Sequence, residues 1–287
     1  QANTTASQNT AIGSRALFTN TTGNNNTAVG ACSLEANLDG VRNTAVGHRA
    51  LKDNTDGDCN SAFGFNALGT NTTGCYNIAV GLEALKLNTT ASSNTAVGTD
   101  ALKLNTTGAN LTALGAFALD ENTTGSSNTA IGSGALNKNT TGDFNIAVGS
   151  NALCKNVTSD SNTAVGYFSL RCNTGANNTG VGMCSLGANT TGANNTAIGS
   201  FAMYEGTTTG SFNTMMGVSS GRKMTSGAQN TASGVNAMES NTTGASNVAM
   251  GMSALTANTT GGANVAIGAT AGDAVTTGSN NAVRLEP

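Results

Sequence analysis

The residue types best able to do chemistry in this sequence are six cysteines and one histidine. His48 falls at a variable position of the repeat described below, so we expect a solvated surface role for it. No Ser-His-Asp or Cys-His arrangement for nucleophilic catalysis can be assembled from the other residues. The cysteines form no CxxC pair and no Cys/His cluster of the kind that binds zinc. We therefore predict a protein that is not an enzyme and that has no catalytic residues, no metal site and no cofactor.

The elements that must position any site follow from one short repeat. Residues 9–25 read NTAIGSRALFTNTTGNN, and residues 26–42 read NTAVGACSLEANLDGVR. We number the positions of the repeat as slots 0 to 16, with slot 0 at the Asn of NTAVG. Thirteen of the sixteen intervals between repeats are 17 residues long, two are 16 and one is 18. The repeats start at residues 9, 26, 43, 60, 77, 94, 111, 128, 145, 162, 178, 195, 213, 230, 247, 264 and 280.

A fixed period this short is the signature of a solenoid, in which each repeat forms one coil. Gly, Asn and Thr occupy several slots of every repeat, and these residues disfavour helices. We therefore predict an all-β fold, a narrow parallel β-solenoid (β-roll) of about 17 coils, with the TAVG and SAL-type pieces as short strands and NTTG as a turn. Residues 1–287 would form a single domain, with a partial first coil at 1–8 and a partial last coil at 280–287. At about 4.8 Å per coil, the rod would be roughly 80 Å long.

The slots divide into a predicted core and a predicted surface. Slot 4 is Gly in every complete repeat, which indicates a positive φ or a contact too close for a Cβ atom. Slot 3 is almost always apolar and slot 8 is Leu in twelve repeats, so these two slots are predicted to form the core stripes. Slot 2 is mostly Ala, either as a smooth stripe that another rod can approach or as part of a tight interior. Of the 27 charged residues, 24 fall in slots 5, 6, 9, 10, 15 and 16, where solvent is expected.

Composition argues against several classes of function. Only 9% of the residues are charged, the net charge is −3, and no basic cluster occurs, so a nucleic-acid-binding surface is not expected. No apolar run approaches the roughly 20 residues of a membrane span, so no membrane insertion is predicted. The chain shows no signal peptide and starts at Gln1 rather than Met, which leads us to expect a processed, exported protein. The predicted location is extracellular, or on a cell or virion surface.

Asparagine recurs at slot 11, where it opens NTT in most repeats. Each such triplet is an Asn-x-Thr glycosylation motif, but stacked asparagines can also form a ladder of amide hydrogen bonds. Asn37, Asn54 and Asn173 keep the asparagine without the motif, so we predict a ladder as the reason for the pattern, with glycans on exposed sites compatible with it. The candidate N-glycosylation sites at slot 11 are Asn3, Asn20, Asn71, Asn88, Asn105, Asn122, Asn139, Asn156, Asn189, Asn241 and Asn258, and four others are Asn25, Asn110, Asn177 and Asn194.

Two pairs of cysteines lie in neighbouring coils, one slot apart, namely Cys59 with Cys75 and Cys154 with Cys172. Stacked coils bring such Cα atoms to about 5 Å, within the range of about 4.4–6.8 Å found in disulfides. We therefore predict these two disulfides. Cys32 and Cys184 share slot 6 but lie nine coils apart, so they are predicted either to bond between chains or to remain free thiols.

The ends of the chain suggest assembly. Gln1 falls in slot 9 and Pro287 in slot 7, so the chain stops close to where it starts, and no capping sequence appears at either end. An uncapped solenoid exposes edge strands that invite pairing with another chain. We therefore expect self-association, head-to-tail into a fibre. The alternative is that caps lie in segments outside this sequence.

The consensus NTAVGxxALxxNTTGxx resembles repeats of phage tail-fibre-like and bacterial surface proteins. Its TAVG core is also similar to the SVAIG motif in the heads of trimeric autotransporter adhesins. The resemblance covers nearly the whole chain. It implies a left-handed parallel β-roll, often trimeric, in surface adhesion or fibre structure, and therefore lateral or trimeric association as an alternative to the head-to-tail fibre.

These patterns predict an extracellular structural protein, a stiff β-solenoid rod that assembles into a surface fibre that could carry glycans. The alternative is an adhesin or tail-fibre shaft that binds glycans, which would need aromatic side chains gathered on one face, whereas here they are scattered over several slots. A minor alternative is an ice-binding protein. Such a protein usually displays Thr in a T-x-T pattern on a strand, whereas the Thr pairs noted here are adjacent within a turn.

Overall fold

The computed structural model describes residues 4–284, in which all regular structure is β. Three residues with predicted roles, Gln1, Asn3 and Pro287, lie outside the described residues. The prediction of an all-β parallel solenoid with a repeat of about 17 residues is confirmed. The chain divides into two compact units, unit 1 (Gln1–Phe144) and unit 2 (Asn145–Pro287), and each is a stack of coils. A long apolar helix of the kind that crosses a membrane does not occur in residues 4–284.

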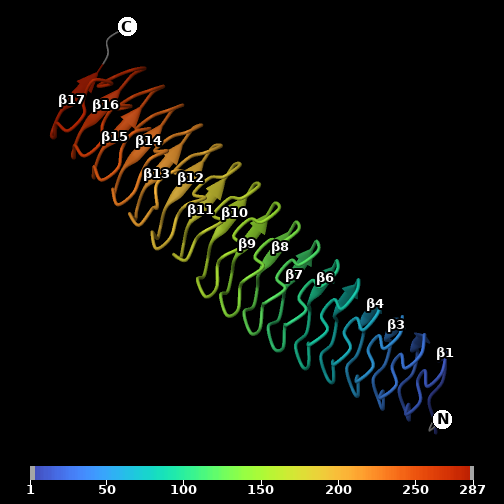
Figure 1. Ribbon diagram of the computed structural model, residues 1–287. Helices are drawn as coiled ribbons and strands as arrows, with labels where there is room; N and C mark the ends of the chain where they lie inside the picture. The colour runs from blue at the N-terminus through green and yellow to red at the C-terminus, as the bar shows by residue number, and fades with distance from the viewer. Residues whose placement is uncertain (1–3, 285–287) are drawn as a thin grey trace. The chain divides into compact units, whose positions relative to one another are not determined.

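The strands of each unit are parallel, follow chain order and pair in register one repeat apart, so that Thr27 faces Thr44 and Ala28 faces Ala45 (Figure 1). The strands of unit 1 are β1 (Thr10–Ile12), β2 (Thr27–Val29), β3 (Thr44–Val46), β4 (Ser61–Phe63), β5 (Ile78–Val80), β6 (Thr95–Val97), β7 (Thr112–Leu114) and β8 (Thr129–Ile131). The strands of unit 2 are β9 (Ile146–Val148), β10 (Thr163–Val165), β11 (Thr179–Val181), β12 (Thr196–Ile198), β13 (Thr214–Met216), β14 (Thr231–Ser233), β15 (Val248–Met250), β16 (Val265–Ile267) and β17 (Ala282–Arg284).

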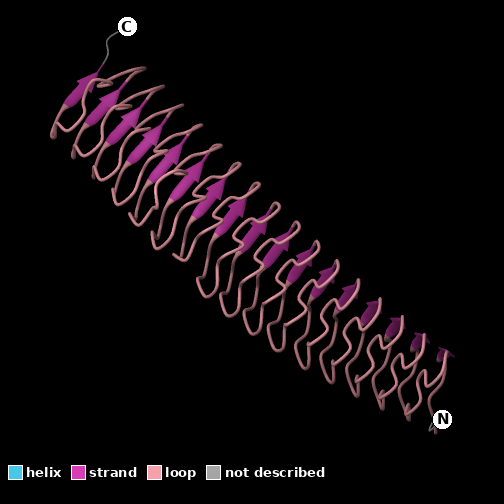
Figure 2. Cartoon of the chain, viewed as in Figure 1, coloured by secondary structure: helices cyan, strands magenta, loops and turns pink. Residues whose placement is uncertain are grey.

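Each coil contains a single three-residue strand, formed by slots 1 to 3, and turns make up the rest of the coil (Figure 2). The prediction of a second strand at the SAL-type segments is wrong. Residues in slots 6 and 8 have a left-handed backbone, for example Cys32 with φ 58° and Leu34 with φ 47°, which an extended strand cannot contain. Backbone hydrogen bonds nevertheless join the coils here too, because Leu34 N donates to Ala50 O at 3.1 Å.

The core of each unit is formed by slots 2, 7 and 8. Ala45, Ala50 and Leu51, one from each of these slots, are fully buried. The prediction that slot 3 forms a core stripe is wrong, because slot-3 side chains such as Val80 and Val97 are exposed. Successive side chains of a strand point to opposite faces, so an inward slot 2 places slots 1 and 3 outward. Of the two roles considered for slot 2, the tight interior is the one observed.

Leucine at slot 8 has an unfavourable backbone conformation, and its side chain is buried in the core. Leu51 and Leu102 have φ values of 50° and 53°, and both are fully buried. A left-handed conformation costs a residue with a side chain about 1–2 kcal/mol, whereas burial of a leucine side chain contributes about 1.5–3 kcal/mol. Burial therefore outweighs strain, which explains why this slot holds leucine rather than the glycine that a positive φ favours.

Where slot 8 lacks leucine, a neighbouring slot can supply the missing volume. In the coil of β13, Gly221 replaces the slot-8 leucine and Met215 replaces the slot-2 alanine. Met215 is fully buried, and a Cβ atom at Gly221 would lie 2.9 Å from the Met215 sulfur. The long, flexible methionine side chain thus occupies the space of the absent leucine.

The register of the last coil differs from the one predicted. Val265 pairs with Ala282. Asn281 N donates to Asn264 Oδ1 at 2.9 Å, as slot-0 backbone groups do in other coils. Slot 0 is therefore Asn281 rather than Asn280. The last repeat starts at residue 281, the interval before it is 17 residues, and Arg284 lies in slot 3.

Glycine at slot 4 is required by both conformation and space. Gly47 has φ 136°, in a region essentially closed to residues with a side chain. A Cβ atom at Gly47 would lie 2.4 Å from the carbonyl oxygen of Gly64, the slot-4 residue of the next coil. That neighbour is backbone held in the coil-to-coil ladder, so it cannot move aside without disrupting the stack. The two reasons predicted for this glycine are thus both present.

We predict that Gly47→Ala lowers the free energy of unfolding by about 3 kcal/mol or more, since strain and overlap act together. Urea unfolding followed by circular dichroism measures the change. The matched control is Gly262→Ala in slot 15, a position where Ala245 and Ala228 stand in other coils. Similar small effects for the two variants would contradict the assignment of slot 4.

Candidate functional site

The asparagines of slot 11 form the predicted ladder, which is confirmed. Asn105 is fully buried, and its Nδ2 donates to Asn88 Oδ1 of the preceding coil at 3.0 Å and to the carbonyl oxygen of Gly108 at 2.9 Å. Its Oδ1 accepts from Asn122 Nδ2 of the next coil at 2.9 Å. Each amide therefore links three coils and also closes the turn of its own coil, which a buried polar group requires.

A second ladder runs through slot 0, for which no role was predicted. Asn43 N donates to Asn26 Oδ1 of the preceding coil at 2.8 Å, and Asn43 Nδ2 donates to the carbonyl oxygen of Gly57 at 2.8 Å. The same Gly57 oxygen accepts from Asn54 Nδ2 of slot 11 at 3.0 Å. The two ladders thus meet at the slot-14 carbonyl. The near-constant Asn of NTAVG was the signal that could have revealed this second ladder.

Interruptions of the slot-11 ladder leave identifiable atoms without partners. Gly206, Met224 and Val275 replace the slot-11 asparagine in three coils of unit 2. In the coils that precede Gly206 and Val275, Asn189 Oδ1 and Asn258 Oδ1 are buried and have no hydrogen-bond partner. These orphan oxygens lie where the next amide would have donated, so the ladder is directional and each asparagine depends on its successor.

The ladder separates the predicted glycosylation sites into two groups. The described slot-11 candidates, Asn20, Asn71, Asn88, Asn105, Asn122, Asn139, Asn156, Asn189, Asn241 and Asn258, are buried, which leaves a glycan no room in the folded coil. By contrast, Asn25, Asn110, Asn177 and Asn194 are exposed in the turn that precedes the strand. Among the described residues, glycosylation therefore remains a prediction for these four asparagines.

The six cysteines are free thiols in the structure, so neither predicted disulfide is formed. Stacking aligns residues of the same slot, whereas the predicted partners lie one slot apart. The Cys75 sulfur accepts from Asp58 N, its slot-15 counterpart, at 3.2 Å rather than facing Cys59. The Cys154 thiol likewise donates to the carbonyl oxygen of Arg171, its slot-9 counterpart, at 3.8 Å.

The bond between chains predicted for Cys32 and Cys184 is disfavoured by their surroundings. Cys184 is buried, and burial raises the pKa of its thiol. A hydrogen bond with Glu35 raises the pKa of the Cys32 thiol. Because the thiolate is the reactive form, both changes slow disulfide formation. Both cysteines are free thiols within the one chain described, and the bond between chains stays a prediction.

Charged residues form ion pairs on the outside of slots 6, 9 and 10. In unit 1, Glu83 lies 2.9 Å from Lys86 and 2.9 Å from Lys103, and Lys103 lies 3.5 Å from Asp100. Hydrogen bonds from Lys86 and then Lys103 lower the pKa of Glu83, and the bond to Glu83 raises the pKa of Lys103. Exposed pairs of this kind contribute at most about 1 kcal/mol each. They cover the surface with paired charge rather than build a reactive centre.

His48 and the acidic residues form no metal site within residues 4–284. The His48 ring stacks on Phe65 of the next coil, with ring centroids 5.4 Å apart, which fits a surface position. No group of three or more His, Cys, Asp or Glu side chains in the described part of the chain is arranged to hold a metal ion. His48 therefore packs against an aromatic ring, and the described residues place no nucleophile or set of metal ligands beside it.

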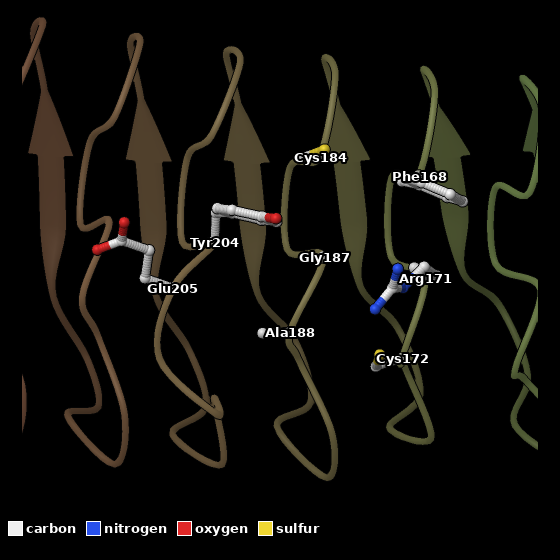
Figure 3. A pocket seen from close by; sticks show the side chains of 8 residues that line it. All are labelled: Phe168, Arg171, Cys172, Cys184, Gly187, Ala188, Tyr204 and Glu205. Carbon is white, nitrogen blue, oxygen red and sulfur yellow. The ribbon is translucent and has the colours of Figure 1, made fainter.

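A cavity of about 340 Å³ opens on unit 2, and it is the feature most like a binding site. The middle of its three coils carries Gly187 and Ala188 in slots 9 and 10, where the flanking coils carry Arg171 with Cys172 and Tyr204 with Glu205. The small residues leave a notch in the ridge of side chains, as Figure 3 shows. The remaining lining residues are Phe168 and Cys184.

Aromatic and charged groups hold fixed positions around this notch. A Cβ atom at Gly187 would lie 3.0 Å from the Tyr204 ring, so the ring packs directly on the glycine. Phe201 meets Tyr204 edge-on at 5.3 Å, and the Arg171 guanidinium lies 5.0 Å from the centroid of the Phe168 ring. The cavity thus combines an aromatic wall with one cation and one carboxylate, a mixture suited to an uncharged or anionic polar ligand. The aromatics of this region are gathered in space although their slots differ.

We predict that Asn105→Ala lowers the free energy of unfolding by about 3 kcal/mol, because it removes three buried hydrogen bonds and takes one partner each from Asn88 Oδ1 and Asn122 Nδ2. Urea unfolding measures the loss. The matched control is Asn110→Ala in the same coil, whose exposed side chain belongs to no ladder and should cost less than about 0.5 kcal/mol. A small effect of Asn105→Ala would show that the ladder adds little to stability.

Comparison with known proteins assigns no family to this geometry. No family model and no curated protein matches the sequence. The similarity of the TAVG core to the heads of trimeric autotransporter adhesins therefore stays a prediction that depends on the motif alone. Function has to be argued from the ladders, the strand surface and the cavity of this chain.

Proposed function

We propose that this protein is an extracellular structural element, a stiff β-solenoid rod that serves as a segment of a surface fibre. The observation that carries this proposal is the coil-to-coil bonding described for both units. Backbone groups and two rows of buried amides join each coil to the next, so bending or pulling a stack requires many hydrogen bonds to break together. A chain whose coils are joined by so many hydrogen bonds is suited to bearing a mechanical load.

The surface of the coils is consistent with a role at the outside of a cell or virion. The net charge is small and the ion pairs lie on slots that vary between coils. The four exposed asparagines could carry glycans without disturbing either ladder. No nucleic-acid contact is proposed, since the chain has only 12 basic residues and several of them are paired with acids.

Self-association is proposed as the route from rod to fibre. Every coil presents the same row of backbone donors and acceptors to its neighbours, so a coil of one molecule can pair with a coil of another. Contacts of this head-to-tail type do not close on themselves and generate filaments. Lateral or trimeric packing, which the resemblance to adhesin heads implies, is the competing arrangement.

We expect negative-stain electron microscopy of the purified protein to show filaments with an axial repeat near the length of one chain, roughly 80 Å at about 4.8 Å per coil. Filament length should grow with protein concentration, as head-to-tail contacts require. Short particles that stay single at every concentration would contradict the fibre, and particles grouped in threes would favour the trimeric arrangement.

Glycan binding is the second candidate function, and the cavity of unit 2 is the observation that favours it. Sugar rings present an apolar face that packs on aromatic side chains, and hydroxyl groups that bond to charged ones. Tyr204 and Phe168 supply the aromatic surfaces, and Arg171 supplies a donor that is not engaged in an ion pair among the described residues. On this proposal the rod carries an adhesive notch.

We expect the full chain to bind a subset of glycans on an array and Tyr204→Ala to reduce that binding at least tenfold, through loss of about 1.4 kcal/mol of stacking. The matched control is Phe117→Ala, an exposed aromatic of slot 6 in unit 1 that lies outside the cavity. Equal binding by the two variants, or no binding by the wild type, would remove the glycan proposal and leave the structural one untouched.

A further inference from the structure

The outward surface of the strands in unit 1 combines hydroxyl and aliphatic side chains in two straight rows. We call this surface the strand face and define it by slots 1 and 3 of β1 to β8. Slot 1 is Thr in six of these strands, Ser61 in β4 and Ile78 in β5. Slot 3 is Val, Ile or Leu in seven of them and Phe63 in β4. The strand face carries no charged residue, although charged residues are common in slots 6 and 9 of the same coils.

The hydroxyl groups of the strand face are not used to hold the fold together. The threonines of the turn at slot 12 donate between coils, since Thr72 Oγ1 bonds to Thr89 O at 3.0 Å and Thr106 Oγ1 bonds to Thr123 O at 3.0 Å. The slot-1 threonines Thr95 and Thr112, in contrast, make no side-chain hydrogen bond within residues 4–284. Both residues are half-buried and lie on the outward side of their strands, opposite the buried alanine of slot 2. One row of threonine is structural, whereas the other is available to a ligand.

The strand face is regular and rigid. Neighbouring strands pair residue for residue, with Thr95 against Thr112 and Val97 against Leu114. Successive rows are therefore spaced by about 4.8 Å along the stack, and slots 1 and 3 by about 6.6 Å along each strand. Threonine and valine have stiff, β-branched side chains, and the buried alanines between them are locked in the core. The hydroxyls and methyls thus form a two-dimensional array with little freedom.

We propose that the strand face of unit 1 binds ice. The slot-1 row spaces hydroxyl groups by about 4.8 Å, an interval close to that between water molecules on the surface of an ice crystal, and the methyl groups of the neighbouring slot-3 row order the water that they cannot bond. A rigid array loses little conformational entropy on adsorption. The ordered water of an ice surface is the ligand that matches such a repeating pattern. The absence of charged side chains on the strand face also favours ice, because charged groups disrupt an ordered water layer.

This inference goes beyond the structural role proposed above and does not depend on it. It also differs from the ice-binding alternative considered from the sequence, which concerned the adjacent threonines of NTT. Those residues are bonded between coils, whereas the threonines of the strands alternate with buried alanine as T-A-V. The outward pattern is thus hydroxyl and methyl on one strand, two residues apart.

The test uses the full chain in nanolitre osmometry, which records ice shaping and the gap between melting and freezing points. Wild-type protein should shape ice crystals and open a measurable gap. The paired variant Thr95→Lys with Thr112→Lys places two charges at the centre of the strand face and should reduce the gap by at least half. The matched control, Thr99→Lys with Ala116→Lys, adds the same charges to slot 5 of the same two coils and should leave the gap unchanged.

Thermal unfolding by circular dichroism shows that each variant is folded before its activity is compared. Absence of ice shaping by the folded wild-type protein would overturn the proposal. Equal losses in the two paired variants would overturn it as well, since the effect would not belong to the strand face. Analytical ultracentrifugation measures whether Thr95→Lys with Thr112→Lys dissociates an oligomer. If it does, and the ice-shaping activity is unchanged, the strand face is a protein interface and the proposal is wrong.

Discussion

Hydrogen bonds between the buried amides of successive asparagines join most neighbouring coils, and most other features of the chain depend on them. Asn88, Asn105 and Asn122 form one stretch of this ladder, with donor–acceptor distances of 2.9–3.0 Å. Amides can stack in this way only if the coils lie at the spacing of hydrogen-bonded strands. That spacing leaves no room for a side chain at slot 4, where a Cβ atom would overlap the backbone of the next coil.

The ladders also explain an interior that is polar in part. A coil of 17 residues is too narrow to enclose large side chains from every direction, so alanine fills two inward slots and leucine only one. The turns need internal donors for their carbonyl oxygens, and the slot-14 carbonyl receives one amide from each ladder. Buried asparagine is costly unless it is bonded, and a stack of similar coils gives most ladder asparagines a partner in the neighbouring coil.

Since the inside is devoted to stacking, any specific function has to lie on the outside of the coils. Two kinds of surface result. The strand face repeats almost without change and therefore suits a repeating partner. The slots of the turns vary, and in unit 2 the replacement of bulky residues by Gly187 and Ala188 opens a cavity beside Tyr204. Repetition supports mechanical or lattice-like roles, whereas local departures from it support discrete binding.

Much of this architecture was determined by the sequence itself. The 17-residue period, the constant glycine and the NTT motif predict a parallel solenoid and an asparagine ladder, because stacked coils place residues of one slot in one environment. The period does not say which side of the strand faces inward. Apolar Val97 and small Ala96 were both reasonable core residues, and only the curvature of the closed coil decided that alanine is buried and valine exposed.

The remaining decisions also belong to tertiary structure. Cys59 and Cys75 lie close along the coil axis, but their side chains follow their own slots rather than meet, which no spacing argument could reveal. Phe201 and Tyr204 occupy different slots, so the sequence did not show that their rings meet. Residues in different turns of one coil can share one surface. Sequence thus determined the repeat and the residues that stack, whereas the closed path of each coil determined which of them reach solvent.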